Sequence, residues 1–128
     1  MTRRLILVTI AAALVAGCAA AGPTPPPVAA PVGAAVEIRL VAQDIAFVPT
    51  AVGAPTGVPL HIVLDNQDDG IPHDIALFGV DGATKLGATD IVAGPASAEM
   101  AVPGLVPGTY QLLCEVHPTM VSTLTVGG

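Results

Sequence analysis

The sequence predicts an all-β domain, a Greek-key β-sandwich or barrel of about eight strands. Apolar and polar residues alternate within several short windows, and turn-forming residues separate them; the chain of 128 residues contains 14 Gly and 13 Pro. No window of eleven or more residues shows convincing helical periodicity. Short strands at regular spacing are typical of sandwiches and barrels, and this length suits a single domain.

The first strand is expected at residues 36–41, where Val36, Ile38 and Leu40 share one face and Glu37 and Arg39 share the other. A period of two is the pattern of a half-buried strand. The same pattern, or an apolar run between turn residues, predicts further strands at 45–49, 60–64, 71–80, 98–102, 108–114 and 122–126.

Some of these segments carry more specific expectations. Alternation within 60–64 turns His61 and Val63 outward, so His61 is interpreted as a solvated strand residue and not as a second metal site. The acidic turn 65–69 lacks the spacing of a calcium loop and is expected to be solvated. The irregular stretch 80–91 is predicted to be a loop.

The N-terminal residues 1–17 have the features of a secretory signal peptide. An apolar run, residues 5–16, follows Arg3 and Arg4 and is too short for a membrane-spanning helix, which needs about 20 residues. The run ends in LVAGC and resembles the lipobox of bacterial lipoproteins, which implies cleavage after Gly17 and lipidation of Cys18. The alternative is an ordinary signal peptide with an incidental cysteine.

Residues 18–35 are predicted to be the lipidated cysteine and a linker. The stretch 19–35 contains Ala, Pro, Gly and Val with a single Thr and no charge, and three consecutive prolines at 25–27 favour an extended chain. The folded domain is therefore expected at residues 36–128, attached to the cell envelope and facing the periplasm or the cell exterior.

The charge of the chain excludes nucleic acid as a partner. Ten acidic residues oppose four basic ones, and only Arg39 and Lys85 would remain of the basic residues after removal of the leader. A surface without clustered cations cannot collect phosphates, and it cannot bind anionic lipid through a polybasic patch.

Metal-ligating side chains gather near the C-terminus. Cys114, His117 and Met120 follow one another with two residues between each, and His73 lies 41 positions before Cys114. Two imidazoles, one thiolate and a weak thioether form the donor set that copper uses for electron transfer. The domain has no second cysteine with which Cys114 could form a disulfide. A thiol that stays free in an oxidising compartment indicates a specific role, such as metal binding.

These residues resemble the copper loop of the cupredoxins, the blue-copper family that includes plastocyanin and amicyanin. The similarity rests on the run GTYQLLCEVHPTM at 108–120, and on the upstream Phe47-Val48-Pro49, the strand that ends in Asn66, and Pro72-His73. It implies a Greek-key sandwich with one copper per chain, held by His73, Cys114, His117 and Met120. The short Cys-to-Met spacing is closest to the amicyanin type.

The resemblance also implies a function. The protein would be a monomeric carrier of single electrons, His117 would lie nearest the surface, and its partners would be envelope redox proteins such as a cytochrome or an oxidase. A copper carrier that delivers the metal to another protein is the alternative. An enzyme is disfavoured, because a mononuclear site with four protein ligands has no open position for a substrate.

Two acidic residues depart from the better-known family pattern, which usually has Asn after the first His and a hydroxyl residue after Cys. Here Asp74 and Glu115 occupy these positions. If their carboxyl groups meet, they would share a proton and tie the two ligand loops together. Alternatively, both point into water.

Tyr110 shares a predicted strand face with Leu112 and Cys114. A tyrosine at such a position could relay electrons, but it is more often structural. We therefore expect its hydroxyl to bind a neighbouring loop.

Overall fold

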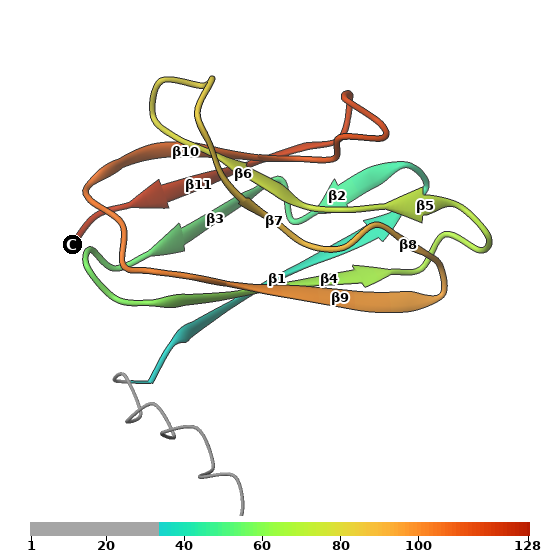
Figure 1. Ribbon diagram of the computed structural model, residues 1–128, viewed down its shortest axis with the longest axis horizontal. Helices are drawn as coiled ribbons and strands as arrows, with labels where there is room; N and C mark the ends of the chain where they lie inside the picture. Colours follow the sequence, from blue (N-terminus) through green and yellow to red (C-terminus); the bar gives the residue numbers. More distant parts are fainter. Residues whose placement is uncertain (1–33) are drawn as a thin grey trace, which may run out of the picture.

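The computed structural model describes residues 34–128, which contain eleven strands and no helix (Figure 1). Accordingly, no helix in this part of the chain could span a membrane. The predicted all-β class is confirmed, whereas the leader, Cys18 and the linker up to residue 33 lie outside the described residues. The strands are β1 (Val36–Gln43), β2 (Ala46–Val48), β3 (Ala51–Ala54), β4 (Leu60–Asn66), β5 (Pro72–His73), β6 (Ala76–Phe78), β7 (Lys85–Ala88), β8 (Val92–Ala93), β9 (Ala96–Val102), β10 (Gly108–Leu113) and β11 (Val121–Val126).

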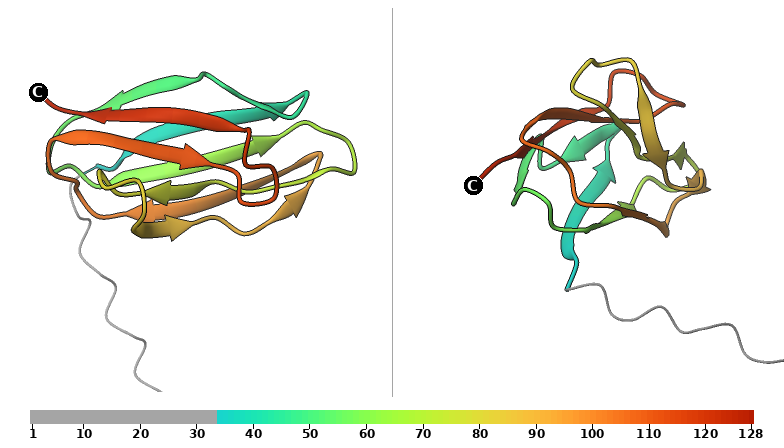
Figure 2. Two further views of the ribbon diagram at one scale, coloured as in Figure 1. Left: turned by 90° about the horizontal axis from the view of Figure 1, so that it is seen from above. Right: turned by 60° about the vertical axis from the view of Figure 1, so that its left-hand side comes forward.

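Two mixed sheets form the body of the domain (Figure 2). One has the order β2-β1-β4-β9 and the other β3-β11-β10-β6-β7, while β5 and β8 form a separate two-stranded ribbon. The pairs β1–β4 and β3–β11 are parallel, and the remaining pairs are antiparallel. Both sheets contribute side chains to one apolar cluster, among them Leu40 and Ile62 from the first sheet and Leu112 and Leu124 from the second. Burial of this cluster is the main driving force for the fold.

The alternation predicted for β1 is confirmed, because Ile38 and Leu40 are buried while Glu37 and Arg39 are exposed. Val63 was predicted to face outward, but its side chain is not exposed to solvent: only 6% of its surface is accessible. β4 is a central strand, and Val63 lies in register between two long side chains, those of Arg39 on β1 and Glu99 on β9. Long charged side chains on neighbouring strands cover apolar surface with their stems.

Two segments differ from the prediction. The predicted strand 71–80 is divided into β5 and β6, because the chain leaves the β5–β8 ribbon and joins β10 in the larger sheet. The predicted loop 80–91 contains β7, which pairs with β6 across an irregular register. Short strands of two to four residues such as these raise the count from about eight to eleven, and they carry too little periodicity to be found from the sequence.

The domain has two different ends. β1 begins and the chain terminates at one end, whereas β5, β8 and the loop between β10 and β11 gather at the other (Figure 1). Near the first end, Tyr110 Oη donates a hydrogen bond of 2.9 Å to the carbonyl of Val106. The structural role predicted for Tyr110 is thereby confirmed.

Candidate metal centre

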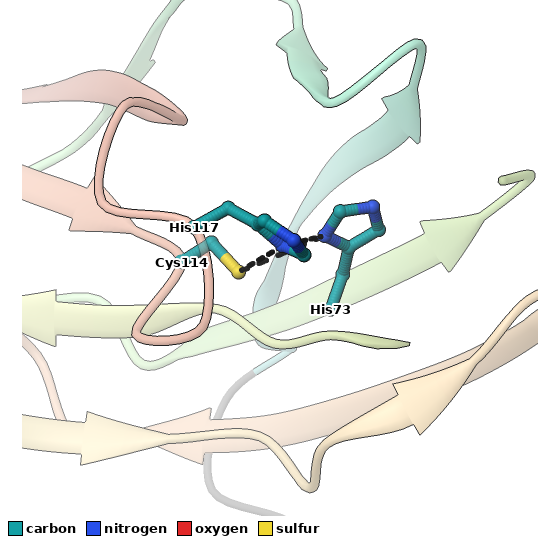
Figure 3. A group of neighbouring side chains, drawn as sticks. All are labelled: His73, Cys114 and His117. Carbon is teal, nitrogen blue, oxygen red and sulfur yellow. Dashed lines mark hydrogen bonds between the residues drawn. The ribbon is translucent and has the colours of Figure 1, made fainter. Parts of the chain in front are cut away.

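Three predicted ligands meet at the end of the sandwich where β5 and the β10–β11 loop lie (Figure 3). His73 Nδ1 lies 3.1 Å from His117 Nδ1 and 3.7 Å from Cys114 Sγ, and Cys114 Sγ lies 4.0 Å from His117 Nδ1. Within residues 34–128 this is the one group of three or more His, Cys, Asp or Glu side chains close enough to hold a metal ion.

The size of this triangle matches a single metal ion. First-row metals such as zinc bind imidazole nitrogen at about 2.0–2.1 Å and thiolate sulfur at about 2.3 Å. The three separations are therefore short enough for one ion to contact both nitrogens and the sulfur.

Each ligand is placed by a different part of the fold. His73 is the last residue of β5, and Cys114 directly follows β10. The loop that carries His117 is closed by its own backbone, because Cys114 N donates to the carbonyl of Met120 at 3.1 Å and Met120 N donates to that of His117 at 2.9 Å. Met120 is fully buried immediately before β11. A short closed loop between two paired strands therefore fixes the spacing of the C-terminal residues.

Family comparison agrees with this geometry. Residues 5–126 match the family model described as a cupredoxin-like domain. The chain belongs to this family. No curated protein matches the chain at a significant level.

Solved cupredoxins share the fold at low sequence identity. Auracyanin from Roseiflexus castenholzii is 21% identical, over 75% of this chain and 100% of that one, with a TM-score of 0.64. Auracyanin A from Chloroflexus aurantiacus, described as a "blue" copper protein, is 18% identical over 73% and 99%, with a TM-score of 0.63. Amicyanin from Paracoccus versutus is 19% identical over 72% and 80%, with a TM-score of 0.53. The predicted fold family is thereby confirmed.

The donor set of this cupredoxin fits copper. Thiolate suits Cu(I), imidazole suits both oxidation states, and a trigonal His2Cys set with a weak methionine is typical of copper electron-transfer sites. A closed structural zinc site would instead be tetrahedral, with additional Cys or His ligands. The His2Cys donor set and the nearby buried Met120 therefore indicate copper and not zinc.

Cys114 has to lose its proton to bind the metal. Burial raises the pKa of this thiol above its ordinary value, while the backbone N–H groups of Asp74 and His117 act in the opposite direction. In the metal-free protein the thiol is thus protonated at neutral pH, and copper binding releases a proton.

Asp68 is a site residue that the sequence did not identify. Its carboxylate accepts a hydrogen bond of 2.9 Å from His73 Nε2, and its side chain is 9% exposed. The backbone N–H of Ile45 and the bond from His73 hold the pKa of the Asp68 carboxyl below its ordinary value, against the effect of burial. The expectation that the whole turn 65–69 is solvated is therefore wrong for Asp68.

Asn66, which the sequence marks only as the end of a strand, organises the turn. Its Nδ2 donates to the carbonyls of Ile71 and Val92 at 2.8 Å each, and its Oδ1 accepts from Asp68 N at 3.0 Å. Asn66 is fully buried with each of its polar atoms bonded. An Asn at the end of a largely apolar strand is the one sequence signal that could have marked it.

The predicted proton shared by Asp74 and Glu115 is wrong. Asp74 Oδ1 accepts a hydrogen bond of 2.8 Å from the backbone N of Glu115, and the Glu115 side chain instead pairs with Lys85 Nζ at 3.0 Å. The two ligand segments are still joined, but by the hydrogen bond from the backbone N–H of Glu115 to the carboxylate of Asp74. A backbone donor satisfies the buried carboxylate without requiring a protonated partner, so no shared proton is needed.

His61 is partly exposed on β4, and its Nε2 lies 2.9 Å from Glu99 Oε2. This agrees with its interpretation as a strand residue apart from the metal centre.

Proposed function

We propose that this cupredoxin is a blue copper protein that carries single electrons, with one copper per chain. His73, Cys114 and His117 would be the three close ligands, and Met120 the weak fourth ligand. The observation that carries the proposal is the close approach of two Nδ1 atoms and one Sγ, which lie 3.1, 3.7 and 4.0 Å apart. Because such a donor set suits both Cu(I) and Cu(II), little rearrangement is needed when an electron moves.

The different exposure of the two histidines indicates through which ligand electrons would pass. His73 is completely buried, whereas His117 is partly exposed and stands between the exposed residues Val116 and Pro118. An apolar rim around a partly exposed ligand suits brief contact with a redox partner, because a partner can approach without displacing charged groups. We propose that electrons enter and leave through His117.

We further propose that the domain is attached to the cell envelope through lipidated Cys18, with residues 1–17 removed and residues 18–35 as the linker. It would face the periplasm or the cell exterior and serve a cytochrome or an oxidase there. The arrangement of the domain supports this proposal, because β1 begins at the end opposite to the metal centre (Figure 1). A linker joined there would leave the His117 end free for partners.

The visible absorption spectrum of the copper-loaded protein tests the function. We expect an intense thiolate-to-copper band that disappears on reduction and returns on oxidation, and we expect Cys114→Ser to abolish it. A colourless copper form would refute the proposal. Competition with a Cu(I) chelator separates the electron carrier, which should retain its metal, from a copper-delivery protein, which should release it readily.

The anchor is tested separately. Cys18→Ala is expected to release the protein from the membrane fraction without changing the spectrum. A variant that stays in the membrane fraction would show that lipidation of Cys18 is not what holds the protein there.

A further inference from the structure

The carboxylate of Asp68 joins a backbone turn to a metal ligand. Oδ1 accepts from Asp44 N at 2.6 Å, and Oδ2 accepts both from Ile45 N at 2.9 Å and from His73 Nε2 at 2.9 Å. Asp68 N is itself bonded to Asn66 Oδ1 at 3.0 Å. Besides its contact with the histidine, the side chain is thus held by two backbone N–H groups, and its own backbone is held by Asn66.

The turn that binds this carboxylate adopts an unfavourable backbone conformation. Asp44 and Ile45 have φ values of 54° and 55°, in the left-handed region that non-glycine residues rarely occupy and that is least suited to a β-branched side chain. Successive N–H groups in such a turn form a concave anion-binding site. Here the anion is the Asp68 carboxylate, so an unusual backbone conformation coincides with the group that contacts His73.

This contact determines which nitrogen of His73 carries the proton. A carboxylate only accepts hydrogen bonds, so Nε2 must carry the hydrogen and Nδ1 must present its lone pair. Nδ1 is the atom directed at Cys114 and His117. Carboxylate partners of this kind orient metal-binding histidines and make them more basic.

We propose that Asp68 is a positioning residue of the metal centre, which holds His73 in the Nε2-protonated tautomer and favours Cu(II) over Cu(I) through its buried negative charge. This inference rests on the proposed function in its redox part only. Asp74 does not position His73, because its carboxylate contacts the backbone of Glu115.

The tautomer is tested on the metal-free full chain at neutral pH by ¹⁵N NMR of the imidazole nitrogens. We expect His73 to carry its proton on Nε2 in the wild type, and we expect Asp68→Asn to lose this preference. A proton on Nδ1 in the wild type would overturn the proposal. The wild-type measurement, which alone can overturn the proposal, needs neither copper nor a stable variant.

The charge is tested by the reduction potentials of the copper-loaded full chain and two variants. Asp68→Asn is expected to weaken the preference for Cu(II) about tenfold, which raises the potential by about 59 mV. The matched control is Asp69→Asn, which removes an equal charge from the exposed neighbouring residue, and it should change the preference less than about twofold, or about 18 mV. Asp68→Glu should restore most of the wild-type value.

Equal shifts in Asp68→Asn and Asp69→Asn would overturn the proposal, because they would show a general charge effect. A wild-type chain that takes up no copper would instead refute the proposed function. The tautomer measurement would still decide whether Asp68 positions His73.

Discussion

The two histidines of the metal centre are held in different ways. His73 is fully buried, and its second nitrogen is bonded to Asp68, which in turn is bonded to the backbone of the β1–β2 turn. His117 lies on a short loop and is partly exposed; its Nε2 has no hydrogen bond to any of residues 34–128. The centre therefore combines a rigid side with an accessible side.

This difference shows how one site can satisfy two requirements. A copper site that transfers electrons must keep its geometry in both oxidation states, and it must also come close to its partner. Buried polar bonds on the His73 side give the first property, because they fix the ligand in one rotamer and one tautomer. The partial exposure of His117 gives the second, because a partner can approach this ligand directly.

The sharpest test of the difference compares the two histidines in the metal-free protein. His73→Ala is expected to lower the free energy of unfolding by about 3 kcal/mol, because it removes a buried ring and leaves Asp68 without its charge-assisted partner. His117→Ala should cost less than about 1 kcal/mol, since the ring is partly exposed. Urea unfolding of both variants measures the two values. Equal losses would mean that the two sides do not differ in rigidity.

The rigid side also depends on Asn66. Asn66→Ala is expected to cost about 2 kcal/mol, because the buried carbonyls of Ile71 and Val92 lose their donor. Gln67→Ala changes the exposed next residue and should stay within about 0.5 kcal/mol of the wild type. If the two variants are equally stable in urea, Asn66 does not organise the turn.

Tyr110 tests the opposite end of the domain. Tyr110→Phe removes the bond to the carbonyl of Val106 and is expected to cost about 1 kcal/mol. The copper spectrum should not change, because this bond lies at the end away from the metal. A shifted spectrum, measured beside thermal unfolding, would show that the two ends are coupled.

The smallest expected effect concerns Asp81 in the β6–β7 turn. Hydrogen bonds from the side chain and backbone of Thr84 and from the backbone of Ala83 lower the pKa of Asp81 to about 2. A lowered pKa in the folded state means that the ionised group adds stability above its unfolded pKa of 3.8, and that this contribution is lost as the pH falls toward 2.

Asp81→Asn should therefore be slightly less stable than the wild type at pH 7, and the gap should close between about pH 4 and pH 2. Acid titration of both proteins by circular dichroism provides the check. A gap that persists at pH 2 would show that the charge of Asp81 is not its cause. Asp81 and Asp68 both accept hydrogen bonds from backbone N–H groups of a turn, but Asp81 is exposed and Asp68 is buried.

The sequence predicted the parts of the molecule that depend on local pattern. Alternation identified the longer strands, and the spacing of Cys114, His117 and Met120 indicated the ligand loop, because these features are set by neighbouring residues. The partner of His73 could not be predicted in this way. Asp68 looks like any acid in a polar turn, and only the approach of the β1–β2 turn, 23 or 24 residues away, makes it a buried ligand contact.

The same reason explains the wrong prediction for Glu115. The family resemblance placed its side chain toward Asp74, but the long-range pairing of β10 with β6 brings the neighbouring β7 close, and Lys85 Nζ on β7 lies 3.0 Å from the Glu115 carboxylate. Contacts between distant segments depend on tertiary structure that periodicity does not contain.

X-ray absorption at the copper edge, recorded on the oxidised and the reduced protein, tests the central claim most directly. The claim is that His73, Cys114 and His117 bind one copper in a geometry that suits both oxidation states. We expect two nitrogen ligands and one sulfur ligand at short distance in both spectra, with little change between them. Loss of the sulfur, or a different set of close ligands after reduction, would contradict the account.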